Sequence, residues 1–94
     1  MRVEFAWEER KNRVNQRKHG ISFETAVLVF YDPYHVSVQD REVDGEPRWQ
    51  TIGMAGGDKV LLVAHTVDDV EDGVRILSAR KATRRERSIY AQGT

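Results

Sequence analysis

The chain has 94 residues, no cysteine, and 15 Lys and Arg residues that balance 15 Asp and Glu residues. This length suits one domain with a modest core, so we expect a single domain over residues 1–94. Without cysteine the chain offers neither a disulfide framework nor a thiolate zinc site. No segment is typical of a signal peptide, and the longest apolar run, Val60 to Ala64, is far shorter than the roughly 20 residues that cross a bilayer. We therefore expect a cytoplasmic protein that makes no contact with membranes.

The zero net charge hides an uneven distribution along the chain. Residues 1–20 carry six basic against three acidic side chains, residues 32–72 carry three against ten, and residues 75–90 carry six against one. Local potential governs the attraction of a charged ligand, so both basic ends are candidates for contact with a polyanion. Solvated helix faces are the alternative interpretation of such runs.

The hydrophobic pattern predicts a strand and two helices in the first third of the chain. Val3 to Trp7 alternates between apolar and polar residues, as in a strand. Glu8 to His19 is predicted to be a helix that Gly20 ends. A second helix is predicted from Ser22, a good N-cap, through Phe30, with Asp32-Pro33 ending it.

Four more strands and a third helix are predicted in the rest of the chain. The strands are Tyr34 to Val38, Trp49 to Met54, Val60 to Thr66 and Val74 to Ala79, with turns at Asp44-Gly45 and Gly56-Gly57-Asp58. Thr83 to Glu86 fits a capping box, so the last helix begins at Thr83. The order β-α-α-β-β-β-β-α predicts an α+β fold with a mainly antiparallel sheet, two N-terminal helices and one C-terminal helix.

Six basic residues fall within 13 positions near the C-terminal end of the sequence: Arg75, Arg80, Lys81, Arg84, Arg85 and Arg87. The planar fork of arginine suits phosphate oxygens, and the start of the last helix adds partial positive charge beside Arg84 and Arg85. Simple alternation places Arg75 and Arg80 on opposite faces of the last strand. A phosphate cradle is the functional hypothesis, and a basic surface paired with the acidic block at 32–72 is the alternative.

Other polar residues could add proton transfer or stacking. His65 can exchange protons near neutral pH or be a satisfied edge histidine, and His19 lies where a helix dipole favours a cation. Glu86 could be a base, but the capping box is the favoured explanation. Tyr90 could stack on a base or pack on the sheet. The histidines lack zinc-ligand spacing, so we expect no metal site and no cofactor.

A basic site of this composition suits RNA cleavage without a metal ion. The 2′-hydroxyl of RNA can attack the adjacent phosphate if one group takes its proton and others offset charge on the phosphoryl oxygens and protonate the leaving oxygen. DNA lacks this hydroxyl and cannot react in this way.

Several sequence blocks, in a fixed order, point to a known family. They are Phe5 to Glu8, Lys11-Asn12 and Asn15, Lys18 to Glu24 with Ala26, Arg48 to Gly53, His65-Thr66, and Arg75 to Thr83 with Glu86, Arg87 and Tyr90. In these blocks the chain resembles the BrnT family, the toxin half of BrnT–BrnA toxin–antitoxin pairs. The resemblance implies a RelE-like ribonuclease fold, an RNA substrate and a ribbon–helix–helix antitoxin resembling BrnA. It also implies that the complex represses its own operon, so that operator DNA is bound only through the antitoxin complex.

The resemblance also implies a site that gathers residues from distant parts of the chain. We expect Arg48 and Arg80 to stabilise the phosphate, and His65, with Lys18 or His19, to transfer protons. The residues expected to bind RNA are Lys11, Arg75, Arg84, Arg85 and Tyr90. We expect the acidic loop Val67 to Asp72 to affect target choice. A non-enzymatic nucleic-acid-binding subunit and a protein-interaction module with an acidic partner are the alternatives to a metal-independent endoribonuclease toxin.

Overall fold

The computed structural model describes residues 3–68 and 72–93, which form a sheet flanked by helices. Its elements are β1 (Glu4–Ala6), α1 (Glu9–His19), α2 (Phe23–Val27), the 3-10 helix η1 (Leu28–Tyr31), β2 (Val36–Val43), β3 (Glu46–Met54), β4 (Val60–Asp68), β5 (Gly73–Lys81) and α3 (Arg84–Gln92). The predicted α+β class and the order β-α-α-β-β-β-β-α are confirmed. Within the described residues, no helix is long and apolar enough to cross a membrane.

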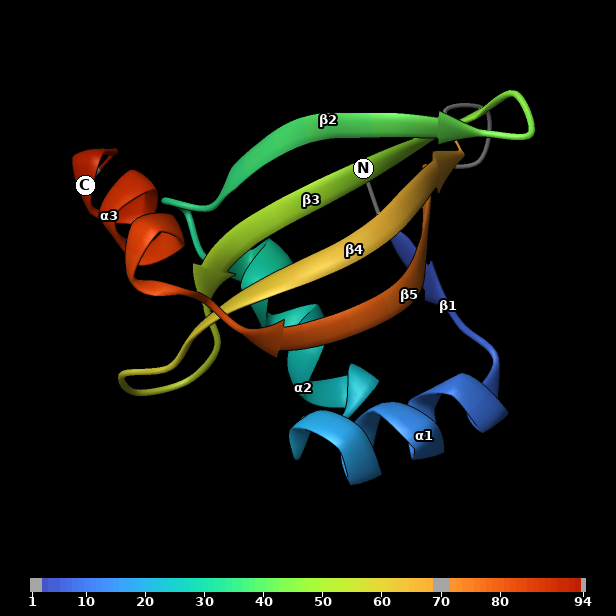
Figure 1. Ribbon diagram of the computed structural model, residues 1–94, viewed down its shortest axis with the longest axis horizontal. Helices are drawn as coiled ribbons and strands as arrows, with labels where there is room; N and C mark the ends of the chain where they lie inside the picture. The colour runs from blue at the N-terminus through green and yellow to red at the C-terminus, as the bar shows by residue number, and fades with distance from the viewer. Residues whose placement is uncertain (1–2, 69–71, 94) are drawn as a thin grey trace.

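The sheet has the strand order β1-β5-β4-β3-β2, and β1 is its one parallel strand (Figure 1). Strands β2 to β5 form an antiparallel meander, as the short predicted turns require. The chain begins at one edge with β1, passes through α1 and α2, and enters the meander at the opposite edge through β2. The pairing of β1 with β5 therefore joins the first strand of the chain to its last.

Strand β2 is longer than the sequence pattern predicts. It runs from Val36 to Val43, whereas Tyr34 to Val38 was the predicted range. Four of its five additional residues, those at 39–42, are polar and exposed because β2 is an edge strand, and a bulge lies between Gln39 and Glu42. Apolar alternation, the signal for a half-buried strand, is therefore missing from this segment.

The predicted second helix divides into α2 and η1, and Ser22 caps it as expected by accepting a hydrogen bond from the Thr25 amide. A shift to 3-10 geometry is common in the last turn of a helix. Here it brings Val29, which is fully buried, directly onto β3 at Gly53. A Cβ atom at Gly53 would lie 2.8 Å from Val29 Cγ1, so this close contact requires glycine.

Helix α1 is attached to the fold by asparagines. Its buried residues are Asn12 and Asn15, whereas Val14 is 45% exposed. The Asn15 amide donates to Ala79 O at 2.8 Å and accepts from Ala79 N at 3.2 Å. Because β1 pairs with β5 only as far as Arg75, Asn15 satisfies backbone groups that β1 leaves open on this edge.

The sheet packs its two faces unequally. The larger apolar core lies between the sheet, α2 and η1 and consists of Ile21, Phe23, Ala26, Val29, Ala55, Leu61, Val63, Ile76 and Ala79. A smaller cluster of Ile52, Leu62 and Tyr90 lies beneath α3 on the other face. Most of the apolar burial that stabilises the fold is therefore on one side of the sheet.

Strand β5 contains a bulge opposite β4. The register pairs Ala64 with Ser78 and His65 with Ile76, so Leu77 is an extra residue without a partner on β4. An extra residue of this kind reverses the alternation of side chains on either side of it.

The bulge changes the faces on which the β5 arginines lie. Ile76 and Ala79 both belong to the large core, although strict alternation would separate them. Arg75 and Arg80 both lie on the opposite face of the sheet, because their partners on β4 are Thr66 and Leu62. The prediction that these arginines occupy opposite faces is wrong, because the alternation rule assumes a strand without bulges.

We expect Asn15→Ala to lower the free energy of unfolding by about 2–4 kcal/mol, since it leaves buried backbone groups of Ala79 without partners. Urea unfolding followed by circular dichroism measures this change. Val14→Ala, at an exposed position of the same helix, is the matched control and should change stability by less than about 0.5 kcal/mol. Equal effects of the two substitutions would contradict the role assigned to Asn15.

Candidate functional site

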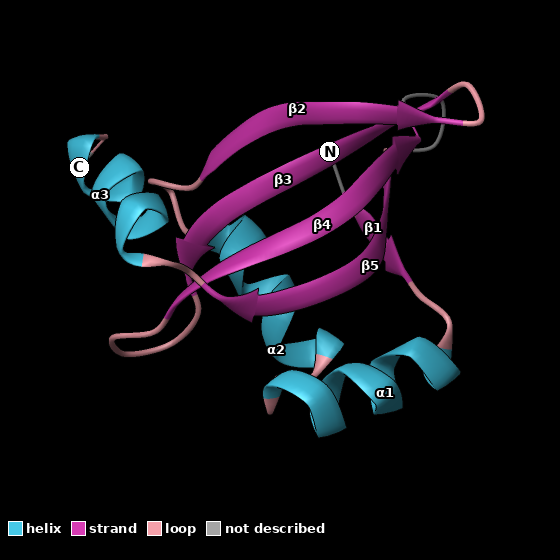
Figure 2. Cartoon of the chain, in the orientation of Figure 1, coloured by secondary structure: helices cyan, strands magenta, loops and turns pink. Residues whose placement is uncertain are grey.

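The two faces of the sheet differ in how much of them the helices cover. Helices α1, α2 and η1 lie on the side of the large core, and α3 crosses only one end of the other face (Figure 2). We call this second side the open face. Val38 of β2 is 47% exposed there, since it pairs with Gln50 next to the rows that α3 covers.

Two arginines of β5 lie on the open face. Arg75 is opposite Thr66, and Arg80 is opposite Leu62, which packs with Tyr90 beneath α3. Arg75 is exposed, and the Arg80 side chain is 37% exposed. Both guanidinium groups can therefore be reached from solvent on the same side of the sheet.

Arg48 of β3 joins this group. Trp49 pairs with His65, so continuing the register by one residue sets Arg48 opposite Thr66. The Arg48 side chain is half-buried, and its Nε is buried without a hydrogen-bond partner in the part of the chain that the structure describes. An unpaired buried donor is costly, and because this Nε is closed off from solvent, an acceptor could reach it only if neighbouring side chains moved.

Small and uncharged side chains separate the three arginines. Gln50, Ala64 and Ser78 follow one another across β3, β4 and β5. No side chain in this row carries a charge, and Ser78 is exposed. The open face thus has a row of uncharged residues between its arginines, and this arrangement suits an extended polyanion.

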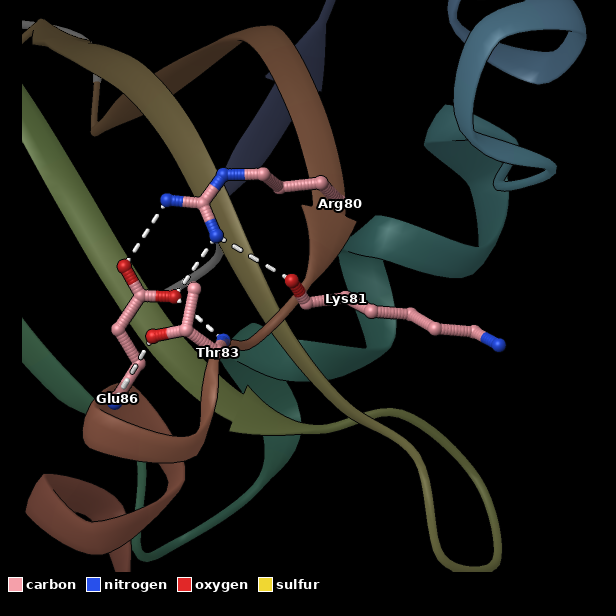
Figure 3. A network of polar contacts seen from close by, with 4 residues as sticks. All are labelled: Arg80, Lys81, Thr83 and Glu86. Atoms are coloured by element: carbon pink, nitrogen blue, oxygen red, sulfur yellow. Dashed lines mark hydrogen bonds and ion pairs between the residues drawn. The ribbon is translucent and has the colours of Figure 1, made fainter.

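Arg80 is held in one orientation by Glu86 at the start of α3 (Figure 3). Arg80 Nη1 donates to Glu86 Oε1 at 2.8 Å, and Nη2 donates to Oε2 at 2.9 Å. Nη1 also donates to the Lys81 carbonyl at 3.2 Å. These bonds use three of the five guanidinium N–H groups, and Nε and the second N–H of Nη2 have no partner among the described residues, so they form an edge that another anion can use.

Glu86 also completes the capping box that the sequence predicts. Its Oε1 accepts from the Thr83 amide at 2.8 Å, and the Thr83 hydroxyl accepts from the Glu86 amide. The Arg80 hydrogen bonds, with those of Thr83, lower the pKa of Glu86 to about 2 in spite of partial burial. The same bonds raise the pKa of Arg80, so both groups are charged at neutral pH.

His65 lies on the face opposite to the three arginines. It is 3% exposed, its Nε2 forms a 2.7 Å hydrogen bond with Thr51 Oγ1, and its ring packs edge-on against Phe30 at 4.9 Å. Burial lowers the pKa of His65 to about 4, so the imidazole is neutral at neutral pH. The structure therefore does not bring His65 together with Arg48, Arg75 and Arg80.

Lys18 and His19 lie at the edge of the sheet beside β5. They follow Asn15 by three and four residues, and helical residues at these spacings share one side of the helix. Asn15 bonds to Ala79, which directly precedes Arg80. Both side chains are exposed, so they are near the edge of the open face rather than on it.

The other residues predicted to bind RNA in the C-terminal helix lie in different surroundings. Tyr90 is 8% exposed and packs on the sheet, and its hydroxyl donates to Asp32 Oδ2 at 2.6 Å. This hydrogen bond and burial raise the pKa of Tyr90 to about 12. Arg84 and Arg85 are exposed at the start of α3.

Two further predictions concern the N-terminal helix and the acidic loop. Lys11 is exposed, and its Nζ lies 3.9 Å from Glu8 Oε2 in a loose surface ion pair. The acidic loop Val67 to Asp72 falls partly outside the described residues, because 69–71 are not among them. Over 3–68 and 72–93, no three or more His, Cys, Asp or Glu side chains form a group that could hold a metal ion.

Sequence patterns do not identify the polar residues of the open face other than the arginines. Thr66 and Ser78 were matched only as parts of family blocks, and Gln50 only within the block around Arg48. Periodicity assigns each to a strand, but their common face depends on the register and on the bulge. No signal within a single strand indicates these pairings.

Stability should depend on pH through His65. The unfolded chain takes up a proton on this residue below its ordinary pKa of 6.5, whereas the folded chain does so only near pH 4. Stability should therefore fall as the pH drops from 6.5 to 4, by about 3 kcal/mol at pH 4 from this residue alone. Urea unfolding at a series of pH values measures the slope.

His65→Gln should remove this part of the slope while keeping a group that can bond to Thr51. The destabilisation it causes at pH 7 should shrink as the pH falls. His19→Gln, at an exposed position, is the matched control for removal of a histidine. A pH slope that is identical in the wild type and His65→Gln would show that His65 is not held neutral.

Comparisons with known proteins identify relatives by sequence pattern and by fold. A family model described as "Ribonuclease toxin, BrnT, of type II toxin-antitoxin system" matches residues 7–86. The crystal structure of the Brucella abortus ribonuclease toxin BrnT is similar, with a TM-score of 0.63 and 19% sequence identity. The match covers 88% of this chain and 100% of that chain. No curated protein sequence matches the chain.

Proposed function

Because this chain belongs to the BrnT family, the ribonuclease toxins of type II toxin–antitoxin systems, we propose that it cleaves RNA on the open face of its sheet. The observation that carries this proposal is the convergence of Arg48, Arg75 and Arg80 on that face. In the part of the chain that the structure describes, no helix lies over the centre of this face, so a single RNA strand can lie across β3, β4 and β5.

Arg80 is the central phosphate ligand in this proposal. Glu86 fixes the guanidinium through two hydrogen bonds and leaves the edge formed by Nε and Nη2 free. A fork held in advance loses little side-chain entropy when it binds the phosphate. Arg48, which is half-buried on the same face, supplies a second guanidinium group.

The reaction is an internal transfer that needs no metal ion. The RNA 2′-hydroxyl loses its proton and attacks the adjacent phosphorus, and the bond from phosphorus to the 5′-oxygen of the next nucleotide breaks. The products are a 2′,3′-cyclic phosphate and a 5′-hydroxyl, which receives a proton as it leaves. Arg48 and Arg80 offset the charge that grows on the phosphoryl oxygens.

Lys18 or His19 serves for proton transfer in this proposal. Both lie on α1 beside Ala79, so a flexible side chain can reach over the β5 edge to a phosphate on Arg80. His65, which was expected to share this task, is neutral and buried on the covered face. We assign His65 to holding β4 against η1 through Thr51 and Phe30.

An antitoxin partner follows from the family, and we propose a ribbon–helix–helix protein encoded beside this chain. Acidic side chains on the antitoxin would compete with RNA for the arginines of the open face. The complex, rather than the toxin alone, would bind operator DNA and repress its own operon. RNA held by Lys11, Arg84 and Arg85 at the margins would be displaced as the antitoxin binds.

Purified wild-type protein should cleave RNA in the presence of EDTA and leave 2′,3′-cyclic phosphate ends. Arg80→Ala should lower the cleavage rate at least about 100-fold, because it removes a donor aimed at the developing charge. Gel assays with end-labelled RNA measure both results. Arg41→Ala, at an exposed position on the β2 edge, is the matched control and should cleave like the wild type.

Expression of the protein alone should arrest growth, and co-expression of the neighbouring gene product should relieve the arrest. RNA that binds to a folded protein but stays intact under all conditions would favour a non-enzymatic nucleic-acid-binding function. Negligible RNA affinity at moderate salt would favour a protein-interaction module and contradict the proposal.

Lys18→Ala and His19→Ala distinguish the two candidates for proton transfer. The substitution that removes the group in use should lower the cleavage rate by about 100-fold or more while RNA affinity falls much less. It should also change the pH profile of the rate. If both variants keep the wild-type rate and profile, α1 takes no part in the chemistry.

A further inference from the structure

A cavity of about 300 Å³ lies at the end of the sheet that α3 crosses. It is lined by Asp58, Lys59, Val60, Lys81 and Arg87. The hairpin between β3 and β4 contributes the first two residues, and the end of β5 and α3 contribute the last two (Figure 1). One water molecule takes up roughly 30 Å³ in the liquid, so this volume has room for an anion of the size of a phosphate group.

Backbone contacts bring the hairpin and the end of β5 together. Gly56-Gly57 turns the chain through two positive φ angles, and this turn is why glycine is needed there. The Ala82 amide then donates to Val60 O at 2.9 Å, which ties the end of β5 to the start of β4. Lys59 and Lys81 are therefore held on the same cavity although 22 positions separate them in the sequence.

The pair of Arg80 and Glu86 fixes the other side of the cavity. Lys81 directly follows Arg80, and Arg87 directly follows Glu86. Hydrogen bonds of 2.8 and 2.9 Å join the pair, so they also hold the end of β5 against the start of α3. In Figure 3 the Lys81 side chain points away from the Arg80 guanidinium. The two cations therefore serve different positions along a bound strand.

The charge of the lining favours an anion. Three basic side chains face one carboxylate, that of Asp58. The side chains of Lys59, Lys81 and Arg87 are exposed and form no ion pair or hydrogen bond with any described residue. Like charges that converge without a counter-ion repel one another, and a cleft lined by one sign of charge concentrates ions of the opposite sign.

We propose that this cavity binds a backbone phosphate of the RNA strand that lies on Arg80, at a different nucleotide from the one cleaved. The inference rests on the proposed function and extends the RNA path beyond the open face, around the end of β5. A lysine binds phosphate as a point charge and needs no exact orientation. The contact therefore adds affinity for any RNA sequence and selects none.

An acidic side chain of the antitoxin is the other candidate for the cavity. The lining favours the RNA, because Val60 is its one apolar residue, whereas the centre of a protein interface is mainly apolar. RNA also carries a phosphate at every nucleotide. A strand bound at Arg80 therefore brings further anions to this end of the sheet without another partner.

The first test measures binding of an RNA oligonucleotide that carries 2′-O-methyl groups throughout and so cannot be cleaved by its own hydroxyls. Lys81→Gln and Arg87→Gln should each weaken binding about 3- to 10-fold at low salt, equally for different sequences. Each should also make the slope of log Kd against log salt shallower by about 0.7, the value for one phosphate of a single strand.

The second test locates the contact along the strand. In a series of such oligonucleotides, one phosphate at a time is replaced by a neutral methylphosphonate. At one position beyond that held by Arg80, the replacement should weaken binding to the wild type at least about threefold. The same replacement should have less than about a twofold effect on the double variant Lys81→Gln with Arg87→Gln, because the two changes remove one contact.

Three controls accompany these variants. Asp58→Asn removes the one carboxylate of the lining and should tighten RNA binding about 2- to 3-fold, which a merely structural role would not do. Arg41→Gln, at an exposed position on the β2 edge, should leave affinity and salt slope unchanged. The cleavage rate of Lys81→Gln and Arg87→Gln at saturating RNA should stay within about twofold of the wild type while KM rises.

The outcomes separate this inference from the proposed function. A wild type that binds RNA in this pattern but cleaves none would refute the proposed function and leave the phosphate contact in place. If the wild type cleaves RNA but the methylphosphonate pattern is the same in the double variant, the inference is overturned and the function stands. It is also overturned if the variants bind the antitoxin more weakly and RNA as tightly as before, because the cavity then belongs to the protein partner.

Discussion

The single extra residue in β5 determines what this fold can do. Leu77 has no partner on β4, so the alternation of β5 side chains between the two faces of the sheet is reversed at that point. As a result the core receives both Ile76 and Ala79, and the open face receives both Arg75 and Arg80. Without the bulge, one of the two arginines would point into the apolar layer beneath α2, where an unpaired charge is strongly destabilising.

The contact between Arg80 and Glu86 joins stability to the proposed chemistry. Glu86 closes the capping box of α3 and holds the Arg80 fork, so one carboxylate fixes both the helix start and the guanidinium. An ion pair on a surface contributes little to stability by itself. Its importance here is orientation, because a fork with one edge occupied by Glu86 presents the other edge to the open face.

Because most of the packing is on one face of the sheet, a small chain can carry many charged residues that take no part in its core. One face holds the larger apolar core, and α1 adds to it through buried asparagines rather than apolar side chains. The exposed side chains of α1, including Lys18 and His19, are therefore not needed for packing. The other face needs α3 only at one end, where Tyr90 packs on Leu62 and bonds to Asp32.

The sequence by itself determined the order of the elements, the end of α1 and the start of α3. Gly20 ends α1 in a left-handed conformation, and Thr83 with Glu86 starts α3, because these signals act within a few residues of the chain. The family blocks likewise pointed to a ribonuclease toxin. The tertiary structure alone decided the pairing of β1 with β5, the bulge at Leu77 and the burial of His65. Each of these depends on contacts between segments far apart in the chain, which no local pattern encodes.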